Sequence, residues 1–143
     1  MMKPHNGFAL TLSIDLAEID RVNAAFAAFA DAQGFPGKLR STMPVVLDEL
    51  LSNAIKYGFR ERDGGDITVH VDLADGRLAV TITDDGKPFD PFRLEDPDTT
   101  LTTQQRKIGG LGIYIVRNTM EEYSYERVGN RNVLRLVKAI TDN

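Results

Sequence analysis

Residues 49–58 read ELLSNAIKYG, a segment in which two polar residues lie four positions apart within an apolar run. On a helix, Glu49 and Asn53 fall on the same face one turn apart, and Lys56 extends that face by a further turn. The segment predicts a helix that packs with one side and carries a carboxylate, an amide and an ammonium on the other. A solvated surface helix would show the same pattern. The apolar residues that face the core are Val46, Leu47, Leu50, Leu51 and Ala54.

The preceding sequence predicts a strand and two helices. Residues 8–14 alternate between apolar and small or polar side chains, which is typical of a strand with one buried face. Asp15 then caps a helix, whose apolar residues recur at helical spacing until Gly34 ends it. The second helix is expected over residues 38–57, with Pro44 either in its first turns or at a kink.

The remaining sequence predicts two hairpins separated by a long irregular segment. Residues 67–73 and 78–82 alternate with a period of two, and the Asp-Gly pair at residues 75–76 between them is a strong hairpin signal. Periodicity is absent over residues 85–108, a length that compact domains rarely leave without a use. A helix over residues 111–121 and a second hairpin over residues 123–140, turned at Gly129-Asn130, follow.

This order of elements predicts the fold class. Strands that come mostly in hairpins, with enough helices to cover one face, favour a two-layer α/β sandwich over a doubly wound sheet. We expect a mixed, mostly antiparallel sheet with helices packed on one face. A chain of 143 residues with 42% apolar content is the usual size of one domain with one core, so residues 1–143 are expected to form a single domain.

Composition argues against several classes of function. The net charge of −4 leaves no basic stripe for a phosphate backbone, so we expect no direct binding of nucleic acid. There is no cysteine for a disulfide or a zinc site, and the two histidines, His5 in the N-terminal tail and His70 in an expected strand, argue against a histidine metal cluster. With neither a signal-peptide block nor a membrane-spanning run, we expect a cytoplasmic protein without a membrane partner.

Asp84 is a second polar residue that the pattern directs toward the core. It continues the inward alternation of Leu78, Val80 and Ile82 to the end of their strand. An unpaired buried carboxylate is costly or changes its pKa, so Asp84 needs a hydrogen-bond donor from the protein or from a ligand. The amino group of adenine is such a donor, and Gly86 would let the backbone approach a flat base closely. An ordinary Asp-Asp-Gly turn is the competing interpretation.

Residues 109–117 read GGLGIYIVR, in which glycines lead directly into a helix. Glycine-rich backbone at a helix N-terminus presents N–H groups and the positive end of the helix dipole to an anion, which suits a phosphate chain. The segment lacks the Gly-Lys-Ser/Thr ending of a Walker A sequence, and no strand precedes it as in a dinucleotide fingerprint. A flexible hinge is the more common explanation of an isolated GGxG. Its position after a long loop is the more informative feature.

The three segments occur in the order ExxxN on a helix, DxGxP after a strand and GGxG before a helix. In that order they resemble the GHKL, or Bergerat-fold, ATPases shared by gyrase, histidine kinases and mismatch-repair proteins. The chain is most similar to the bacterial anti-sigma factor serine/threonine kinases, because residues 84–91 (DDGKPFDP) carry Pro88 where many members have glycine. Residues 132–138 (NVLRLVK) resemble the closing strand, so the resemblance covers nearly the whole chain.

The resemblance implies a role for each matched residue. Asn53 matches the family's magnesium ligand, with phosphate oxygens and waters completing the octahedral shell. Glu49 matches the general base that accepts a proton from a partner's serine hydroxyl, and Asp84 matches the carboxylate that reads adenine. The backbone positions expected to approach the nucleotide closely are Gly86, Gly109, Gly110, Leu111 and Gly112.

Residues 85–108 would form the lid over the nucleotide. Within this segment Arg106 and Lys107 are both candidates to contact the terminal phosphate. Lys56 is a further candidate for a phosphate contact, although a solvated lysine is an equally good interpretation.

The resemblance implies an ATP-dependent protein serine/threonine kinase of the anti-sigma type, with ATP and Mg²⁺ as cofactors. Such a kinase phosphorylates a small anti-sigma antagonist protein and sequesters a sigma factor, and the resemblance also implies a homodimer. Two alternatives stay open. The chain could be an ATP-gated module that binds its partner without phosphotransfer, or a scaffold whose nucleotide site has decayed.

Overall fold

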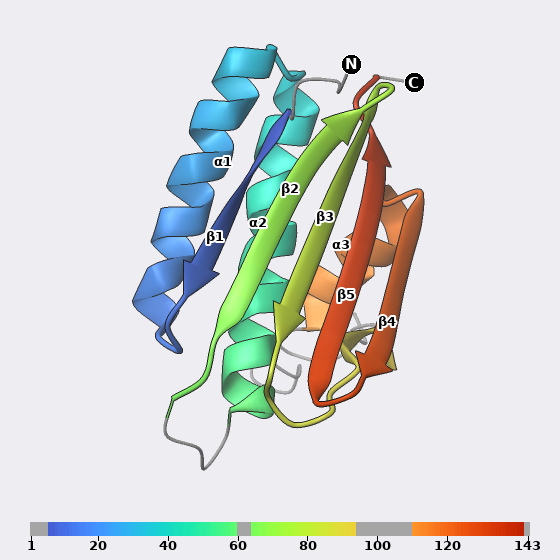
Figure 1. The fold of residues 1–143 in the computed structure, drawn as a ribbon. Helices are drawn as coiled ribbons and strands as arrows, with labels where there is room; N and C mark the ends of the chain where they lie inside the picture. Colours follow the sequence, from blue (N-terminus) through green and yellow to red (C-terminus); the bar gives the residue numbers. More distant parts are fainter. Residues whose placement is uncertain (1–5, 60–63, 94–109, 142–143) are drawn as a thin grey trace, which may run out of the picture.

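The computed structural model describes residues 6–59, 64–93 and 110–141. These residues form two layers, a five-stranded sheet and a layer of helices on one of its faces (Figure 1). In chain order the elements are β1 (Gly7–Leu12), the 3-10 turn η1 (Leu16–Glu18), α1 (Ile19–Gln33), α2 (Gly37–Asn53), the π-helical turn η2 (Ala54–Gly58), β2 (Ile67–Ala74), β3 (Arg77–Asp84), the 3-10 turn η3 (Pro91–Arg93), α3 (Gly110–Thr119), β4 (Glu122–Val128) and β5 (Arg131–Ala139).

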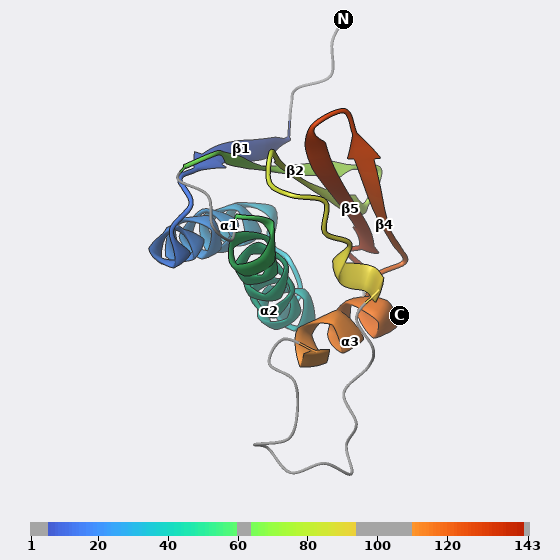
Figure 2. The same cartoon turned by 90° about the horizontal axis from the view of Figure 1, so that it is seen from below.

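The sheet has the order β1-β2-β3-β5-β4. All four strand pairings are antiparallel in the described residues, so the sheet is more regular than the mixed sheet that the sequence predicted. Figure 2 shows α1, α2 and α3 on the same side of the sheet. The predicted two-layer α/β sandwich is therefore confirmed.

Both predicted hairpins form with the predicted turns. Between β2 and β3, Asp75 and Gly76 have φ angles of 53° and 73°, which is the left-handed pair that a two-residue type I′ turn requires. Between β4 and β5, Gly129 has a φ angle of 60°. Because these turns fix the register, alternate residues of each strand face the helices, and Asp84 at the end of β3 is among them.

The predicted helix signals are also found. The Asp15 side chain accepts a hydrogen bond of 2.9 Å from Ala17 N at the start of η1, which leads into α1. Gly34 ends α1 with a φ angle of 66°. The second helix differs from its prediction at the C-terminal end, because α2 stops at Asn53 and the next residues form η2. π-helical turns are rare and are found mostly at functional sites.

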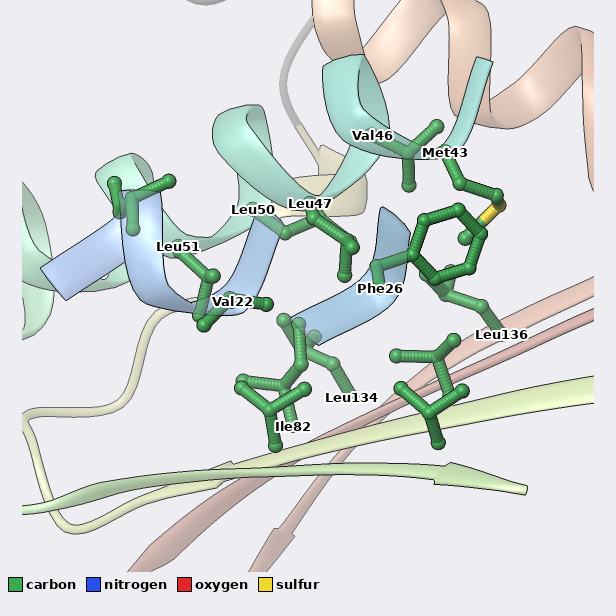
Figure 3. Close-up of a cluster of buried hydrophobic side chains, with 14 of the residues drawn as sticks. Val22, Phe26, Met43, Val46, Leu47, Leu50, Leu51, Ile82, Leu134 and Leu136 are labelled. Atoms are coloured by element: carbon green, nitrogen blue, oxygen red, sulfur yellow. The ribbon is translucent and has the colours of Figure 1, made fainter. Parts of the chain in front are cut away.

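The core lies between the central helix α2 and the inner face of the sheet (Figure 3). One side of α2 is fully buried, which fixes the helix on the sheet and holds its polar side in a defined position. Truncating one of these side chains to alanine typically costs about 2–5 kcal/mol. No helix in the described ranges is both long and apolar enough to cross a membrane. The labelled core residues in Figure 3 are Val22, Phe26, Met43, Val46, Leu47, Leu50, Leu51, Ile82, Leu134 and Leu136.

Candidate functional site

Glu49 and Asn53 lie together at the end of α2, as their spacing predicted. Asn53 is only 3% exposed, and its amide nitrogen donates a hydrogen bond of 3.2 Å to Glu49 Oε1. A carboxylate can only accept, so this contact directs the amide nitrogen toward Glu49 and leaves the amide oxygen facing elsewhere. No hydrogen bond to that oxygen comes from the described residues. Asn53 therefore presents an amide oxygen beside a carboxylate, and that oxygen accepts no hydrogen bond from the described part of the chain.

Helix α3 starts directly against Glu49. A Cβ atom added at Gly112 would lie 2.2 Å from Glu49 Cγ and 2.4 Å from Glu49 Cβ. Only a glycine lets the first turn of α3 approach the Glu49 side chain this closely. The N-terminal turn of α3 is thus held beside Glu49. The predicted approach of Gly112 to phosphate stays a prediction, because the approach that the structure describes is to Glu49.

The surroundings of Glu49 change its acidity. Burial raises the pKa of Glu49 above its ordinary value of 4.5, while the Asn53 hydrogen bond and the charge of Lys56 lower it and Asp48 raises it. A carboxylate with a raised pKa is a stronger proton acceptor than an exposed one. Lys56 itself is exposed within η2, which leaves both of its predicted interpretations open.

Asp84 is buried at the end of β3, with 3% of its surface exposed. Its Oδ1 accepts hydrogen bonds from Gly86 N at 2.8 Å and from Asn132 Nδ2 at 2.9 Å. Burial raises the pKa of Asp84 above its ordinary value of 3.8, and the two hydrogen bonds act against that rise, as does the charge of Arg127. The protein therefore supplies part of the hydrogen bonding that the sequence predicted for this carboxylate.

Gly86 makes the close backbone approach that was predicted for it, but with a protein partner. A Cβ atom at Gly86 would lie 2.7 Å from Gly58 O, and Lys87 N donates a hydrogen bond of 2.8 Å to the same oxygen. The turn after β3 is thus packed against the end of η2. Whether a base also approaches Gly86 stays a prediction.

Asp84 faces a small cavity between the end of α2 and the sheet. Its volume is about 10 Å³, and it is lined by Leu50, Ala54, Asp84, Phe89, Pro91, Asn132 and Leu134. A cavity of this size holds at most one water molecule. Phe89 is one of the lining residues and stacks on Tyr57, with ring centroids 4.9 Å apart. An adenine ring could enter only if the side chains of this lining moved.

Sequence reasoning missed Asn132, Tyr125 and Arg127. Asn132 is 3% exposed and lies directly opposite Asp84 in the pairing of β3 with β5. The signal was available, because Asn132 occupies the same inward alternation as Leu134 and Leu136. An inward polar residue on one strand identified Asp84, and the same argument identifies Asn132.

Several predicted residues lie at or beyond the limits of the described chain. Gly110 begins α3 and Leu111 follows in its first turn. Arg106, Lys107 and Gly109 are outside the described residues. Within the described ranges, no group of three or more histidine, cysteine, aspartate or glutamate side chains could hold a metal ion.

Residues 12–138 match the family described as the histidine kinase-like ATPase domain, and the chain belongs to that family. The serine-protein kinase RsbW of Listeria monocytogenes serotype 4a (strain HCC23) is 22% identical over 131 residues, covering 85% of this chain and 80% of the relative. The serine/threonine-protein kinase BtrW of Bordetella bronchiseptica is 30% identical over 101 residues, covering 69% of this chain and 70% of the relative. These relatives confirm the predicted resemblance to protein serine/threonine kinases.

Solved structures share the fold. The RsbU and RsbW domains of Rv1364c from Mycobacterium tuberculosis match 96% of this chain with a TM-score of 0.70 and 15% identity, and the chain spans 33% of that structure. The histidine kinase AdeS of Acinetobacter baumannii matches 93% of this chain with a TM-score of 0.53 and 15% identity, and the chain spans 68% of it. At this identity the likeness concerns the fold alone.

Proposed function

We propose that this chain is an ATP-dependent protein serine/threonine kinase that acts as an anti-sigma regulatory factor. It phosphorylates a small antagonist protein and sequesters a sigma factor when that antagonist is modified. The observation that carries the proposal is the hydrogen bond between Asn53 and Glu49, next to Gly112 in the first turn of α3. It brings a proton acceptor and an oxygen ligand together at the C-terminal end of α2. The names of the relatives support the kinase activity.

Glu49 acts as the general base. It takes the proton from the partner's hydroxyl as the hydroxyl oxygen bonds to the γ-phosphorus, and the bond from that phosphorus to the bridging oxygen of ADP breaks. The hydrogen bond from Asn53 and the contact with Gly112 hold the Glu49 side chain in one orientation. Burial beside the start of α3 favours a stronger base by raising the pKa of Glu49.

Asn53 fits a magnesium site. Its amide oxygen accepts no hydrogen bond from the described residues, and a hard oxygen ligand of this kind suits Mg²⁺, which takes its other ligands from phosphates and water. When bound, the ion would neutralise charge on the phosphates. The N-terminal turn of α3, including Gly110 and Gly112, would present backbone N–H groups to the same phosphates.

Asp84 recognises the base. In its ionised form it accepts a hydrogen bond from the exocyclic amino group of adenine, a contact that guanine, with a carbonyl there, cannot make. Of the lid residues, Arg106 and Lys107 remain the candidates for the terminal phosphate. A homodimer and a cytoplasmic location complete the proposal by analogy with the anti-sigma kinases.

Transfer of labelled phosphate tests the proposal. The full chain is incubated with Mg²⁺, ATP labelled at the γ-phosphate and a small protein that co-purifies with it from the native cell. We expect label on a serine or threonine of that protein, and a loss of about 100-fold or more in Glu49→Gln with ATP affinity retained. Asp20→Asn, which removes an exposed carboxylate on the neighbouring helix α1, is the matched control and should transfer normally.

Two results would contradict the kinase proposal. One is transfer that continues unchanged in Glu49→Gln. The other is calorimetric binding of ATP without any transfer to a partner, which would favour the ATP-gated binding module instead.

A further inference from the structure

A hydrogen-bond network joins the buried carboxylate of Asp84 to the hairpin of β4 and β5. We call Asp84, Gly86, Tyr125, Arg127 and Asn132 the Asn132 cluster. Asn132 lies at its centre, because it is the register partner of Asp84 across β3 and β5. The cluster thus connects residues that are more than forty positions apart in the sequence.

The Asn132 amide has no hydrogen-bonding capacity left for a ligand. Its nitrogen donates to Asp84 Oδ1 at 2.9 Å and to Lys87 O at 2.8 Å. Its oxygen accepts from Tyr125 Oη at 2.6 Å and from Arg127 Nη1 at 3.1 Å, and Phe89 N donates to it over a longer 3.4 Å. An amide has two N–H donors and two lone pairs, and all four are used. Asn132 therefore acts on Asp84 rather than on a nucleotide.

Arg127, on the edge strand β4, contacts the turn after β3 that contains Gly86. Its Nη1 donates to Gly86 O at 2.8 Å in addition to Asn132 Oδ1. Gly86 N in turn donates to Asp84 Oδ1. One guanidinium nitrogen therefore holds both residues that donate to the Asp84 carboxylate.

The cluster leaves one oxygen of Asp84 for a ligand. Both hydrogen bonds that Asp84 accepts from the described residues go to Oδ1. Oδ2 accepts none of them, while the carboxylate lines the small cavity beside α2. Fixing Oδ1 with two donors sets the direction in which Oδ2 points. Such preorganisation strengthens a single polar contact to a ligand.

We propose that Arg127 and Asn132 are positioning residues for purine recognition, which hold Asp84 so that Oδ2 meets the 6-amino group of an adenine nucleotide. This inference rests on the nucleotide site of the proposed function. It adds a determinant of base specificity on the β4–β5 hairpin.

The test compares two nucleotides by titration calorimetry on the full chain. ATP carries the 6-amino group, whereas purine riboside triphosphate lacks it and is otherwise matched. In Arg127→Met we expect ATP affinity to fall about tenfold, the scale of one hydrogen bond to a charged group, while affinity for purine riboside triphosphate stays unchanged. Arg127→Lys should restore part of the preference for ATP.

Arg135→Met is the matched control. Arg135 is an exposed arginine of β5 that alternates to the opposite face of the sheet from Asn132, so its loss changes the net charge equally. We expect both affinities to match those of the wild type. An equal fall for ATP in Arg127→Met and Arg135→Met would assign the effect to charge and overturn the proposal.

A double substitution separates positioning from general destabilisation. In Asp84→Asn, adding Arg127→Met should weaken ATP binding no further, because the residue through which Arg127 acts is already altered. Additive losses would overturn the proposal. Should Arg127→Met fail to fold, Tyr125→Phe removes only the hydroxyl that donates to Asn132 and should show the same selective loss, and its absence would overturn the proposal.

Failure of the proposed function gives a different result. If the wild-type chain binds neither nucleotide, the nucleotide site itself is wrong. If the wild type prefers ATP, Asp84→Asn abolishes that preference and Arg127→Met retains it, then the nucleotide site stands and only the positioning role is overturned.

Discussion

Gly112 of α3 lies against the side chain of Glu49 so closely that a Cβ atom there would be 2.2 Å from Glu49 Cγ. The start of α3 and the side chain of the proposed base therefore position one another. A Cβ atom added at Gly112 would clash with Glu49 atoms close to the backbone, including Cβ and Cγ. A small rotation of the carboxylate at the end of the side chain would therefore not relieve that clash.

Gly112→Ala tests this contact against helix propensity. Alanine in a helix is normally favoured over glycine by about 1 kcal/mol. Here we expect the free energy of unfolding to fall by about 1–3 kcal/mol, because the added methyl group overpacks the interface between α2 and α3. Phosphotransfer should also fall, since Glu49 is displaced. Denaturant unfolding and the transfer assay measure the two effects.

Gly37→Ala is the control for Gly112→Ala. Gly37 begins α2, and a Cβ atom there would meet no other atom within 4 Å. This substitution should leave stability unchanged or raise it by up to about 1 kcal/mol. A similar gain in Gly112→Ala would show that the contact with Glu49 is not as tight as described.

Asp84→Asn should separate stability from nucleotide binding. The pKa of Asp84 in the folded chain is raised above 3.8, mainly by burial, so folding disfavours its ionised form. That penalty is absent below the unfolded pKa, where both states are protonated, and is fully present above the folded pKa. An asparagine can still accept both hydrogen bonds at Oδ1. We therefore expect Asp84→Asn to be more stable than the wild type at pH 7.

Unfolding at several pH values measures the stability effect of Asp84→Asn. Its gain over the wild type should shrink as the pH falls toward 3.8 and disappear below it. ATP affinity should fall by roughly 10- to 150-fold at pH 7, because the contact to a charged acceptor is lost. A variant less stable than the wild type at pH 7 would mean that the carboxylate is better satisfied by the protein than its burial indicates.

Local signals predicted most of the fold. The alternation of strands, the Asp75-Gly76 turn and the Gly34 helix end are all encoded within a few residues, and all are found. The π-helical turn η2 was not predicted, because five residues are too few to distinguish its period from that of an α-helix. Which strands pair also depends on residues far apart in the chain. For that reason the sequence predicted a mixed, mostly antiparallel sheet, whereas all four pairings among the described residues are antiparallel.

The parts of the site that depend on local sequence were predicted, and the parts that depend on distant contacts were not. Glu49 and Asn53 were identified together because helical spacing alone brings them into contact. Sequence reasoning indicated that Gly86 allows a close approach, but only the tertiary structure shows that Gly58 is the partner. The inward position of Asn132 could have been inferred from its alternation with Leu134 and Leu136, but its hydrogen bond to Asp84, 48 positions away, is seen only in the tertiary structure.

The small size of the cavity beside Asp84 leads to a prediction about the rate of nucleotide binding. Phe89 lines this cavity of about 10 Å³ and stacks on Tyr57, so an incoming base must displace part of the lining. In Phe89→Ala this side chain no longer stands in the way of the base, and we expect ATP to associate faster. The association rate should rise roughly tenfold for each 1.4 kcal/mol by which Phe89 stabilises the arrangement in which the cavity is too small for a base. Stopped-flow mixing with a fluorescent ATP analogue measures the association rate.

Phe92→Ala provides the comparison for Phe89→Ala within the same segment. Phe92 does not line the cavity and packs on Tyr123 instead, with ring centroids 5.1 Å apart. Both substitutions remove a partly buried aromatic ring, so both should lower the free energy of unfolding by about 1–3 kcal/mol, less than the loss for a fully buried phenylalanine. Only Phe89→Ala should change the association rate. Equal rates in the two variants would mean that the base enters without displacing Phe89, and that another part of the cavity lining opens first.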